Sequence, residues 1–453
     1  MPQEFVWHIK KTLSLAWPMV LAQGLSLVAL IVDTIMVGQA GMAELSHLSA
    51  GRSLIFVVTT VGIGLINGIV VFTARLDGAG EAHACGRIWH AGLIYAALLG
   101  ALALAVVGLI GPLMLHLFGL PPELAAGGSR YLAVMAFSVP GTYLLVACSL
   151  FLQGISRPKP AMAVMLVLAP LNVALNWLFI YGKFGLPAWG AAGAALSTAL
   201  CQWLGAIILG LYILRSGKLK RYGVNTPLAG AWRDGAALRR FGIPLGIATG
   251  LEFVGMTALV MFAGRMGEVT ISGFEVAFNL QLIAFITVFG TGSATAVRVG
   301  NAIGARRFDE IFLVGAAGAA VIVIIMMPFA LLYSFTPGPF VAAFTHDAAV
   351  VAMTLSFLPF IVAAMVFDST QFLFLHALRA AGDQLVASSL QVMAFLVLMV
   401  PAGWLFGFVF DLGGRGLMLA YVTGCVAASL SLGGRFAIIA RRYAKAGKYQ
   451  QIK

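Results

Sequence analysis

Long apolar runs recur along the whole of this 453-residue chain, and they constrain its fold more than any other feature. Each run has about 20–25 residues, the length that an α-helix needs to cross a hydrocarbon layer about 30 Å thick. The chain is 61% hydrophobic and only 10% charged, whereas soluble domains carry about 25% charged residues. Single long runs, rather than short alternating segments, favour helices over a β-barrel. The sequence therefore predicts an all-α polytopic membrane protein.

Twelve such runs are predicted to span the membrane. Because the first run is too long for the apolar core of a signal peptide and lacks a small-residue cleavage site, we expect it to remain as the first span. The predicted spans are residues 13–37, 53–74, 91–118, 131–153, 160–182, 190–214, 241–264, 272–297, 311–334, 350–376, 385–410 and 416–438.

The net charge of +12 is unevenly distributed along the chain. If the N-terminus lies inside the cell, nearly all of the 28 Lys and Arg residues fall on the cytoplasmic side, and the exceptions are Arg52, Arg130, Lys183, Arg265 and Arg415. This asymmetry follows the positive-inside rule. We therefore attribute the basic charge to topology, expect no nucleic-acid partner, and predict that both termini are cytoplasmic.

A long polar stretch divides the chain into two halves that resemble each other. Trp17-Pro18 in the first half corresponds to Ile243-Pro244 in the second, and Arg75 corresponds to Arg298. We predict an N-lobe with the first six helices (1–214), a cytoplasmic linker (215–240), a C-lobe with the last six helices (241–438) and a basic cytoplasmic tail (439–453).

Each half has six predicted spans, which is an even number. Both halves therefore enter the membrane from the same side and form a parallel repeat about an axis along the membrane normal. Two such bundles that face each other can expose a central cavity to either side in turn. The repeat therefore favours a transporter.

One carboxylate, Asp33, lies within the first apolar run. Ionised groups are costly in hydrocarbon and usually mark an ion or substrate pathway. Asn172 and Asn176 are four residues apart and share one helix face, and Thr198 lies in the next span. These side chains would supply oxygen ligands for Na⁺, or hydrogen bonds to a protonated Asp33. In the alternative interpretation, Asp33 has a packing role and the amides only join neighbouring helices.

Two more carboxylates, Glu252 and Asp368, lie near the middle of the seventh and tenth spans. If the two groups meet, they titrate as a coupled pair. Such a pair can hold a proton, a Na⁺ ion or an organic cation, but hardly two of these at once. An antiporter needs this mutual exclusion.

Aromatic and methionine side chains in these segments can form an adaptable apolar wall around a cationic compound. Each of them also suits helix packing or contact with lipid. Glu275, near the outer end of the eighth span, is a further cavity candidate or an interface residue. The wall candidates are Met36, Phe253, Met256, Phe285, Phe360, Met365 and Phe367.

Signals of catalysis are missing from the sequence. The chain has no G-x-x-x-x-G-K-[ST] loop and no H-E-x-x-H motif, so we expect no ATP hydrolysis, no catalytic residues and no cofactor. The four cysteines have neither metal-ligand nor disulfide spacing and are interpreted as small packing residues.

Over essentially its whole length the chain resembles the multidrug and toxic compound extrusion (MATE) family, and within it the bacterial NorM-type branch. The resemblance rests on AWPMVLAQ followed by VDTIMVG, on LNWLFIYGKFGLPAWGAAGAALST, on AVRVGNAIGARR, and on the helices of Glu252 and Asp368. It implies a MATE-like fold of two six-helix lobes that exports cationic, amphipathic compounds coupled to inward Na⁺ or H⁺.

The resemblance also implies roles for individual residues. Asp33, with the amides of Asn172 and Asn176 and the hydroxyl of Thr198, matches the cation site of the N-lobe. Glu252 and Asp368 match an acidic pair in the C-lobe, and Asp347 matches an outer acidic residue of the drug cavity. The chain departs from the family at Ala364, where relatives often carry a Tyr one turn before the tenth-helix Asp.

We interpret the chain as a secondary active multidrug antiporter of the bacterial inner membrane, set in the lipid bilayer and working as a monomer. Na⁺ or H⁺ would bind at Asp33 or at Glu252 with Asp368. A lipid-linked saccharide flippase of similar architecture would need basic residues in its cavity, and the predicted spans carry almost none. A membrane-embedded enzyme would need a G-x-G-D setting or His clusters, and neither is present. An ion channel could not move a solute uphill.

Overall fold

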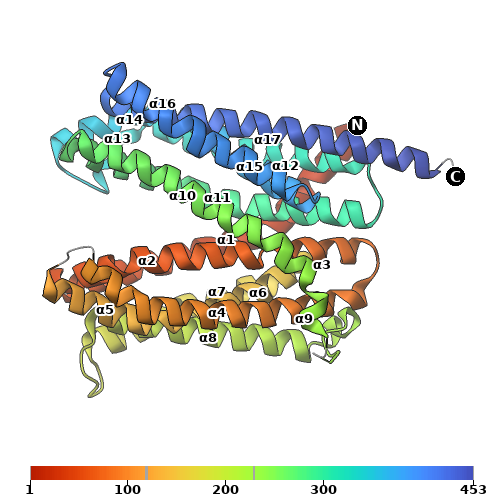
Figure 1. The fold of residues 1–453 in the computed structure, drawn as a ribbon, viewed down its shortest axis with the longest axis horizontal. Coiled ribbons are helices and arrows are strands. Elements are labelled where there is room, and N and C mark those ends of the chain that lie inside the picture. The colour runs from red at the N-terminus through yellow and green to blue at the C-terminus, as the bar shows by residue number, and fades with distance from the viewer. Residues whose placement is uncertain (1, 118–120, 228–229, 452–453) are drawn as a thin grey trace. The chain divides into compact units, whose positions relative to one another are not determined.

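The computed structural model describes residues 2–117, 121–227 and 230–451, and these residues are almost entirely helical. Residue 118 of the third predicted span, residues 228–229 of the predicted linker and residues 452–453 of the predicted tail lie outside this part. The first helices in chain order are α1 (Pro2–Ala40), α2 (Met42–Ile66), α3 (Gly68–Gly78), η1 (Ala82–Ala84), α4 (Cys85–Leu117), α5 (Pro122–Ala136), α6 (Ser138–Gly154), α7 (Lys159–Tyr181), α8 (Gly190–Arg215) and η2 (Gly217–Tyr222) (Figure 1).

The second half of the chain continues in the same way. Its helices are α9 (Ala231–Asp234), α10 (Ala236–Arg265), α11 (Glu268–Gly304), α12 (Glu310–Phe335), α13 (Pro337–Ala342), α14 (Ala348–Ala380), α15 (Gln384–Val392), η3 (Met393–Met399), α16 (Val400–Trp404), η4 (Leu405–Val409) and α17 (Gly413–Gln451). The segments η3 and η4 are π-helical. No break separates them from α15 and α16, and residues 384–409 form one continuous helical segment.

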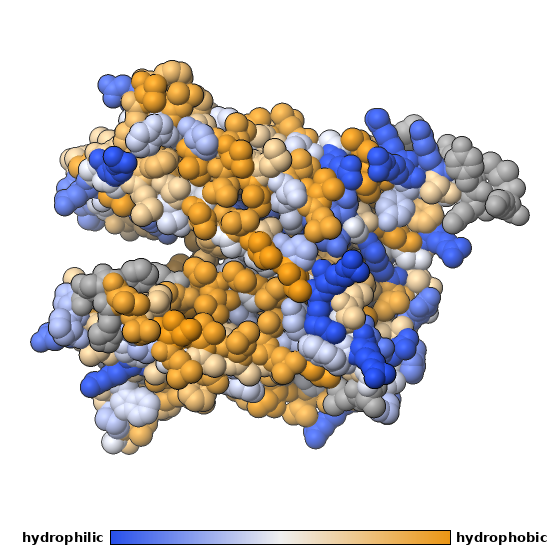
Figure 2. All heavy atoms as spheres, in the orientation of Figure 1, coloured by the Kyte–Doolittle hydropathy of each residue, from blue (hydrophilic) through white to orange (hydrophobic). Residues whose placement is uncertain are grey.

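Twelve helical segments of the described residues are long and apolar enough to cross a membrane, which confirms the predicted number and the all-α class. Large apolar side chains cover their outer surfaces, as the orange areas of Figure 2 show. Leu109 and Phe335, for example, are 78% and 79% exposed. A protein surrounded by water would bury such side chains, whereas acyl chains solvate them at no cost. The chain is a multi-pass membrane protein.

Helices α11 and α14 extend beyond the predicted spans 272–297 and 350–376, and each contains an arginine just past the end of its predicted span. Arg298 lies inside α11 and Arg379 inside α14. Both are buried, with 7% and 6% of their surface exposed. The expectation that the spans carry almost no basic residues therefore needs correction, because two arginines point into the helical core rather than into solvent.

The chain divides into two compact units. We call Leu21–Gly246 the N-terminal unit, and Ile247–Lys453 together with Met1–Val20 the C-terminal unit. The division differs from the predicted lobes in two helices, since the first segment of α1 belongs with the second half and the first segment of α10 with the first half. Pro18 and Pro244, the repeat-related prolines inside these helices, each lie two residues before the change of unit.

The N-terminal unit is built around α6 and α8. α6 packs against α3, α4 and α8, while α2 packs against α4, α5 and α6. The Tyr143 hydroxyl joins α6 to α2 by donating to the carbonyl oxygen of Val58 at 2.8 Å. Gly62 makes this approach possible, because a Cβ there would lie 2.0 Å from that hydroxyl. Small residues allow membrane helices to come this close.

The C-terminal unit is built around α14, which packs against α11, α12, α15 and α17. Its core is a continuous cluster of buried side chains that includes Phe274, Phe357, Met365 and Phe395. Gly315 of α12 provides the closest approach to α17, because a Cβ there would lie 2.2 Å from the Phe436 ring. α14 also holds Asp368.

Candidate cation sites in the two units

The first candidate site lies in the N-terminal unit, where α1, α7 and α8 bring three predicted residues together. Asp33 is partly buried. Its carboxylate accepts a hydrogen bond from Nδ2 of Asn176, and a second one from the Thr198 hydroxyl at 3.2 Å. The structure thus places the amide and the hydroxyl directly on this carboxylate, as the interpretation of the sequence requires.

The two asparagines of α7 form a chain of hydrogen bonds. Nδ2 of Asn176 also donates to Oδ1 of Asn172 at 3.3 Å, as residues four apart on one helix can do. Asn176 is fully buried and Asn172 is 5% exposed. Oδ1 of Asn176 is buried and has no hydrogen-bond partner among the described residues. The site therefore contains an oxygen whose lone pairs are unused.

The second candidate site lies in the C-terminal unit around Asp368 of α14. This residue is only 8% exposed. Its carboxylate accepts from Nε2 of Gln281 in α11 at 3.0 Å and from Nε2 of Gln371, one turn later in α14, at 3.4 Å. The Cys425 thiol of α17 lies 3.8 Å from Oδ1. Three helices therefore hold this carboxylate.

Glu252 of α10 belongs to the same site. It is partly buried and accepts a hydrogen bond from Nε2 of Gln391 at 2.7 Å. It also lies close enough to Asp368 and to Arg379 to interact with both electrostatically. Glu252 thus interacts with a second carboxylate and with a buried arginine, whose Nε has no hydrogen-bond partner among the described residues.

The family departure at Ala364 has a local explanation. Ala364, one turn before Asp368, is fully buried in the core of the C-terminal unit. A tyrosine reaches the carboxylate from another helix instead, because the Tyr421 hydroxyl of α17 lies within hydrogen-bonding reach of Asp368. Tyr421 is 3% exposed.

The glutamines resemble Asn176 in one respect. Each donates its amide nitrogen to a carboxylate, and each leaves its carbonyl oxygen without a hydrogen-bond partner in the described part of the chain. An ionised carboxylate accepts only, so the amide must turn its nitrogen toward it. The unpaired oxygens are Oε1 of Gln281, Gln371 and Gln391.

This donor set limits the chemistry that either site can perform. The described residues contain no group of three or more His, Cys, Asp or Glu side chains that could hold a metal ion. Carboxylate, amide and hydroxyl oxygens suit hard cations rather than soft ones. Both sites can therefore accept a proton or a hard monovalent cation.

The predicted cavity-wall residues take mainly packing positions. Met365 is fully buried in the core of the C-terminal unit, and four others are partly buried against that core: Met256, Phe285, Phe360 and Phe367. Phe253 is partly buried. Met36 packs against the core of the N-terminal unit, and its carbonyl oxygen accepts from the Tyr181 hydroxyl at 3.0 Å.

The two remaining acidic candidates lie near the ends of helices and are exposed. Asp347 is the N-cap of α14, because its carboxylate accepts from the backbone N–H groups of Ala349 and Val350 at 2.9 and 3.0 Å. This capping role explains an aspartate at that position without a ligand. Glu275 lies in the second turn of α11, and Asn279 donates to its carbonyl oxygen at 2.8 Å.

The glutamines, Tyr421 and Arg379 were not among the residues predicted for the second site. A signal was present for the glutamines, because Gln281, Gln371 and Gln391 are uncharged polar residues inside apolar runs. Their pairing with particular carboxylates depends on helix packing, and no sequence spacing encodes it.

Comparison with known families agrees with this geometry. A sequence profile of the MatE family matches residues 18–178 and 244–405, which together cover most of the chain and one segment in each half. The chain belongs to the MatE family. The matched segments contain Asp33, Asn172, Asn176, Glu252 and Asp368.

Named relatives cover nearly the whole chain. A protein named "Probable multidrug resistance protein NorM" from Caulobacter vibrioides is 31% identical over 442 residues, which are 96% of this chain and 93% of that protein. "Multidrug resistance protein NorM" from Vibrio cholerae is 27% identical over 93% of this chain and 94% of its own length.

Solved structures share the fold. The crystal structure of the eukaryotic MATE transporter AtDTX14 superposes with a TM-score of 0.86 at 21% identity, and it covers 98% of this chain and 99% of that chain. An outward-facing multidrug resistance MATE transporter of the MOP superfamily superposes with a TM-score of 0.86 at 19% identity over 95% and 96% of the two chains. The predicted MATE-like fold is confirmed.

Proposed function

We propose that this protein is a secondary active transporter that exports cationic, amphipathic compounds in exchange for Na⁺ or H⁺. It would act in the plasma membrane of a bacterium, with both termini in the cytoplasm and one chain as the working unit. The names of the NorM relatives support multidrug efflux. The acidic sites support the cation coupling.

One observation carries the proposal. Each half of the chain holds a buried or partly buried carboxylate within the membrane-spanning helices, and each of these carboxylates accepts from at least one amide whose carbonyl oxygen has no partner in the described residues. An unpaired buried polar group costs about 1–3 kcal/mol. A cation bound at the site would remove this cost, because it would take the carboxylate and the amide oxygens as ligands together.

Both coupling ions fit the same groups. Na⁺ would be bound by oxygens of Asp33, Asn176 and Thr198, or by those of Asp368, Glu252 and the glutamines. A proton would neutralise a carboxyl group, and the new O–H could donate to an amide oxygen after the amide turns over. A cationic substrate that reaches the carboxylates would compete with either ion, which provides the exchange.

The proposal is tested by separating the two gradients. The purified protein is reconstituted in liposomes, and ethidium transport is followed while either the Na⁺ gradient or the pH gradient is collapsed. We expect transport to stop when the coupling gradient is removed and to continue when the other is removed. Full transport with both gradients collapsed would refute the exchange mechanism.

A matched pair of variants assigns the result to the sites. Asp33→Asn removes a carboxylate that two side chains hold, whereas Glu275→Gln removes an exposed carboxylate of α11. We expect the first variant to lose gradient-driven transport and the second to keep it.

A further inference from the structure

One buried arginine attaches the first segment of α1 to the C-terminal unit. Nη1 of Arg298 donates to the carbonyl oxygen of His8 at 2.7 Å and to the Thr12 hydroxyl oxygen at 2.6 Å. Nη2 lies 2.5 Å from Nδ1 of the His8 ring. Arg298 is 7% exposed, His8 1% and Thr12 not at all. The contact is therefore closed to solvent.

The chemistry of this contact fixes the protonation state of the histidine. An arginine side chain donates only and keeps its charge in proteins. Nδ1 of His8 must therefore accept the hydrogen bond from Arg298. His8 is consequently neutral in this arrangement, and its proton lies on Nε2.

The same segment contacts the unit at a second, apolar place. Leu15, Ala16 and Met19 pack against Ala294 of α11. Gly290 lets the backbones approach, because a Cβ there would lie 2.6 Å from the backbone nitrogen of Val20. After Val20 the helix continues into the N-terminal unit. Arg298 thus holds one end of a helix whose other end belongs to the other unit.

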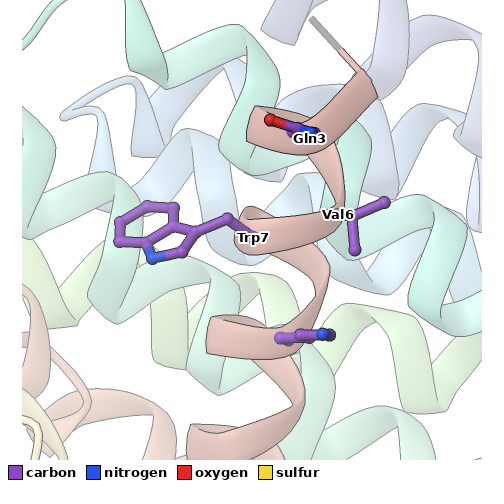
Figure 3. A pocket seen from close by; sticks show the side chains of 4 residues that line it. Gln3, Val6 and Trp7 are labelled. Atoms are coloured by element: carbon purple, nitrogen blue, oxygen red, sulfur yellow. The ribbon is translucent and has the colours of Figure 1, made fainter.

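Part of the surface of this segment is open. Gln3, Val6, Trp7 and Lys10 line a hollow of about 390 Å³ (Figure 3). Trp7 is 46% exposed and Val6 47%. The Lys11 ammonium lies 4.4 Å from the centre of the Trp7 ring, and the Arg298 guanidinium carbon lies 5.8 Å from it. Arg298 therefore contacts this segment through Trp7 as well as through His8 and Thr12.

We propose that Arg298 is a positioning residue that holds the first segment of α1 on the C-terminal unit during transport, and that protonation of His8 releases this segment. A proton from the cytoplasmic solution would bind Nδ1 of His8. The protonated Nδ1 would then be a donor that faces the N–H donor of Arg298, and the positive charges of His8 and Arg298 would lie side by side. The inference rests on the proposed function and on a cytoplasmic N-terminus.

The charges around His8 come from three helices and oppose one another. Burial away from water disfavours the proton on His8 most strongly. Arg298 of α11 and Arg307, just after α11, also disfavour the proton, while Glu310 of α12 and Glu4 of α1 favour it. A histidine in water takes up its proton near pH 6.5. His8 can bind a proton freely only when the segment is released. The contact with Arg298 therefore has its full strength above about pH 6.5, and it weakens as the pH falls below 6.5. Between pH 7.5 and 5.5 the ratio of held to released segment should fall about tenfold.

The direct test is a distance measurement in the full-length protein in liposomes. Spin labels at Leu13 of α1 and Phe312 of α12, both exposed and both in the C-terminal unit, report on the segment. The four native cysteines are buried and would remain unlabelled. We expect the population at the held distance to fall between pH 7.5 and 5.5 in the otherwise unchanged protein.

His8→Asn is the decisive control, because the asparagine oxygen can accept from Arg298 in place of Nδ1 and does not titrate in this range. We expect no pH response of the distance in this variant. Arg298→Met should populate the released distance already at pH 7.5, and Arg298→Lys should restore part of the hold. Equal pH responses with histidine and with asparagine at position 8 would overturn the inference.

Transport gives a second readout that separates this inference from the proposed function. We divide the rate of ethidium transport by the protein with His8 by the rate of the His8→Asn variant at the same pH, which cancels the effect of pH on the coupling cation. We expect this ratio to decrease as the pH is lowered from 7.5 to 5.5. A constant ratio would overturn the inference and leave the exchange mechanism intact. If neither the unchanged protein nor the His8→Asn variant transports ethidium in response to a Na⁺ or pH gradient, the proposed function fails. The distance measurement then still tests whether Arg298 holds the first segment of α1.

Discussion

The two units carry acidic sites that are built differently. In the N-terminal unit one carboxylate, Asp33, is held by one amide and one hydroxyl. In the C-terminal unit two carboxylates share a site with three glutamines, a thiol and the charge of Arg379. Each unit thus holds a carboxylate among its helices, with a different set of donors around it.

This difference has a consequence for the response to mutation. A carboxylate with two donors depends strongly on each of them, whereas one with several donors tolerates the loss of any one. Buried networks of hydrogen bonds also share their energy among many members. We therefore expect single changes of donors to be costly around Asp33 and mild around Asp368, and changes of the carboxylates themselves to be costly in both units.

The largest effect is expected for Asp368→Asn. The amide cannot offer a charged oxygen to a cation, and losing one partner of a buried charge pair costs about 2–5 kcal/mol. Gradient-driven ethidium transport should fall about 100-fold, since each 1.4 kcal/mol is about a factor of ten. The measurement is the initial rate in liposomes, with Asp347→Asn, a change at the helix cap, as the control. A rate within a factor of two of the unchanged protein would contradict the prediction.

Asn176→Leu should have the next largest effect. The change removes the amide donor of Asp33 while it keeps the side chain close in volume. If Na⁺ is the coupling cation, the loss of the amide oxygen as a ligand should raise the half-maximal Na⁺ concentration at least about tenfold. If H⁺ is the coupling cation, the loss of a donor to the ionised carboxylate, about 1.5–3 kcal/mol, should lower the half-maximal proton concentration by a similar factor. An unchanged half-maximal concentration would show that Asp33 does not depend on this amide.

Thr198→Val tests the weaker donor of the same site. The hydroxyl of Thr198 lies 3.2 Å from the Asp33 carboxylate, and valine has nearly the same shape. A difference of about 1 kcal/mol predicts a change of about fivefold in the half-maximal cation concentration, upward for Na⁺ and downward for H⁺, as for Asn176→Leu. A larger effect than that of Asn176→Leu would reverse the order proposed for the two donors.

Gln371→Leu should have the smallest effect, because its bond to Asp368 is 3.4 Å long and Gln281, Tyr421 and Cys425 remain. We expect at most about a twofold change in the half-maximal cation concentration. A change as large as that for Asn176→Leu would remove the proposed contrast between the two units.

The sequence was sufficient for the features that depend on one helix at a time. Length and hydropathy predicted twelve spans, and the spacing of Asn172 and Asn176 placed both amides on one face of α7. The buried carboxylates stood out because ionised groups are rare in apolar runs. These properties follow from the period of a helix and from the cost of burying charge.

Features that depend on which helices meet were not predictable from the sequence. Gln281 and Gln391 are distant from Asp368 and Glu252 in the chain, and only the packing of α11 on α14 and of α15 near α10 brings them together. The same holds for Tyr421, which compensates for Ala364 from another helix. The assignment of the first segment of α1 to the C-terminal unit likewise depends on the contacts of Arg298, and these join residues far apart in sequence.

The most direct test of cation binding at the buried carboxylates is the coupling ratio, the number of coupling cations that enter for each ethidium ion exported. It is measured in liposomes for the unchanged protein and for the Asp33→Asn, Glu252→Gln and Asp368→Asn variants. We predict a fixed whole-number ratio in the unchanged protein, and a reduced ratio or no coupled cation entry in the variants. The same ratio in all four proteins would contradict the assignment of cation binding to these carboxylates.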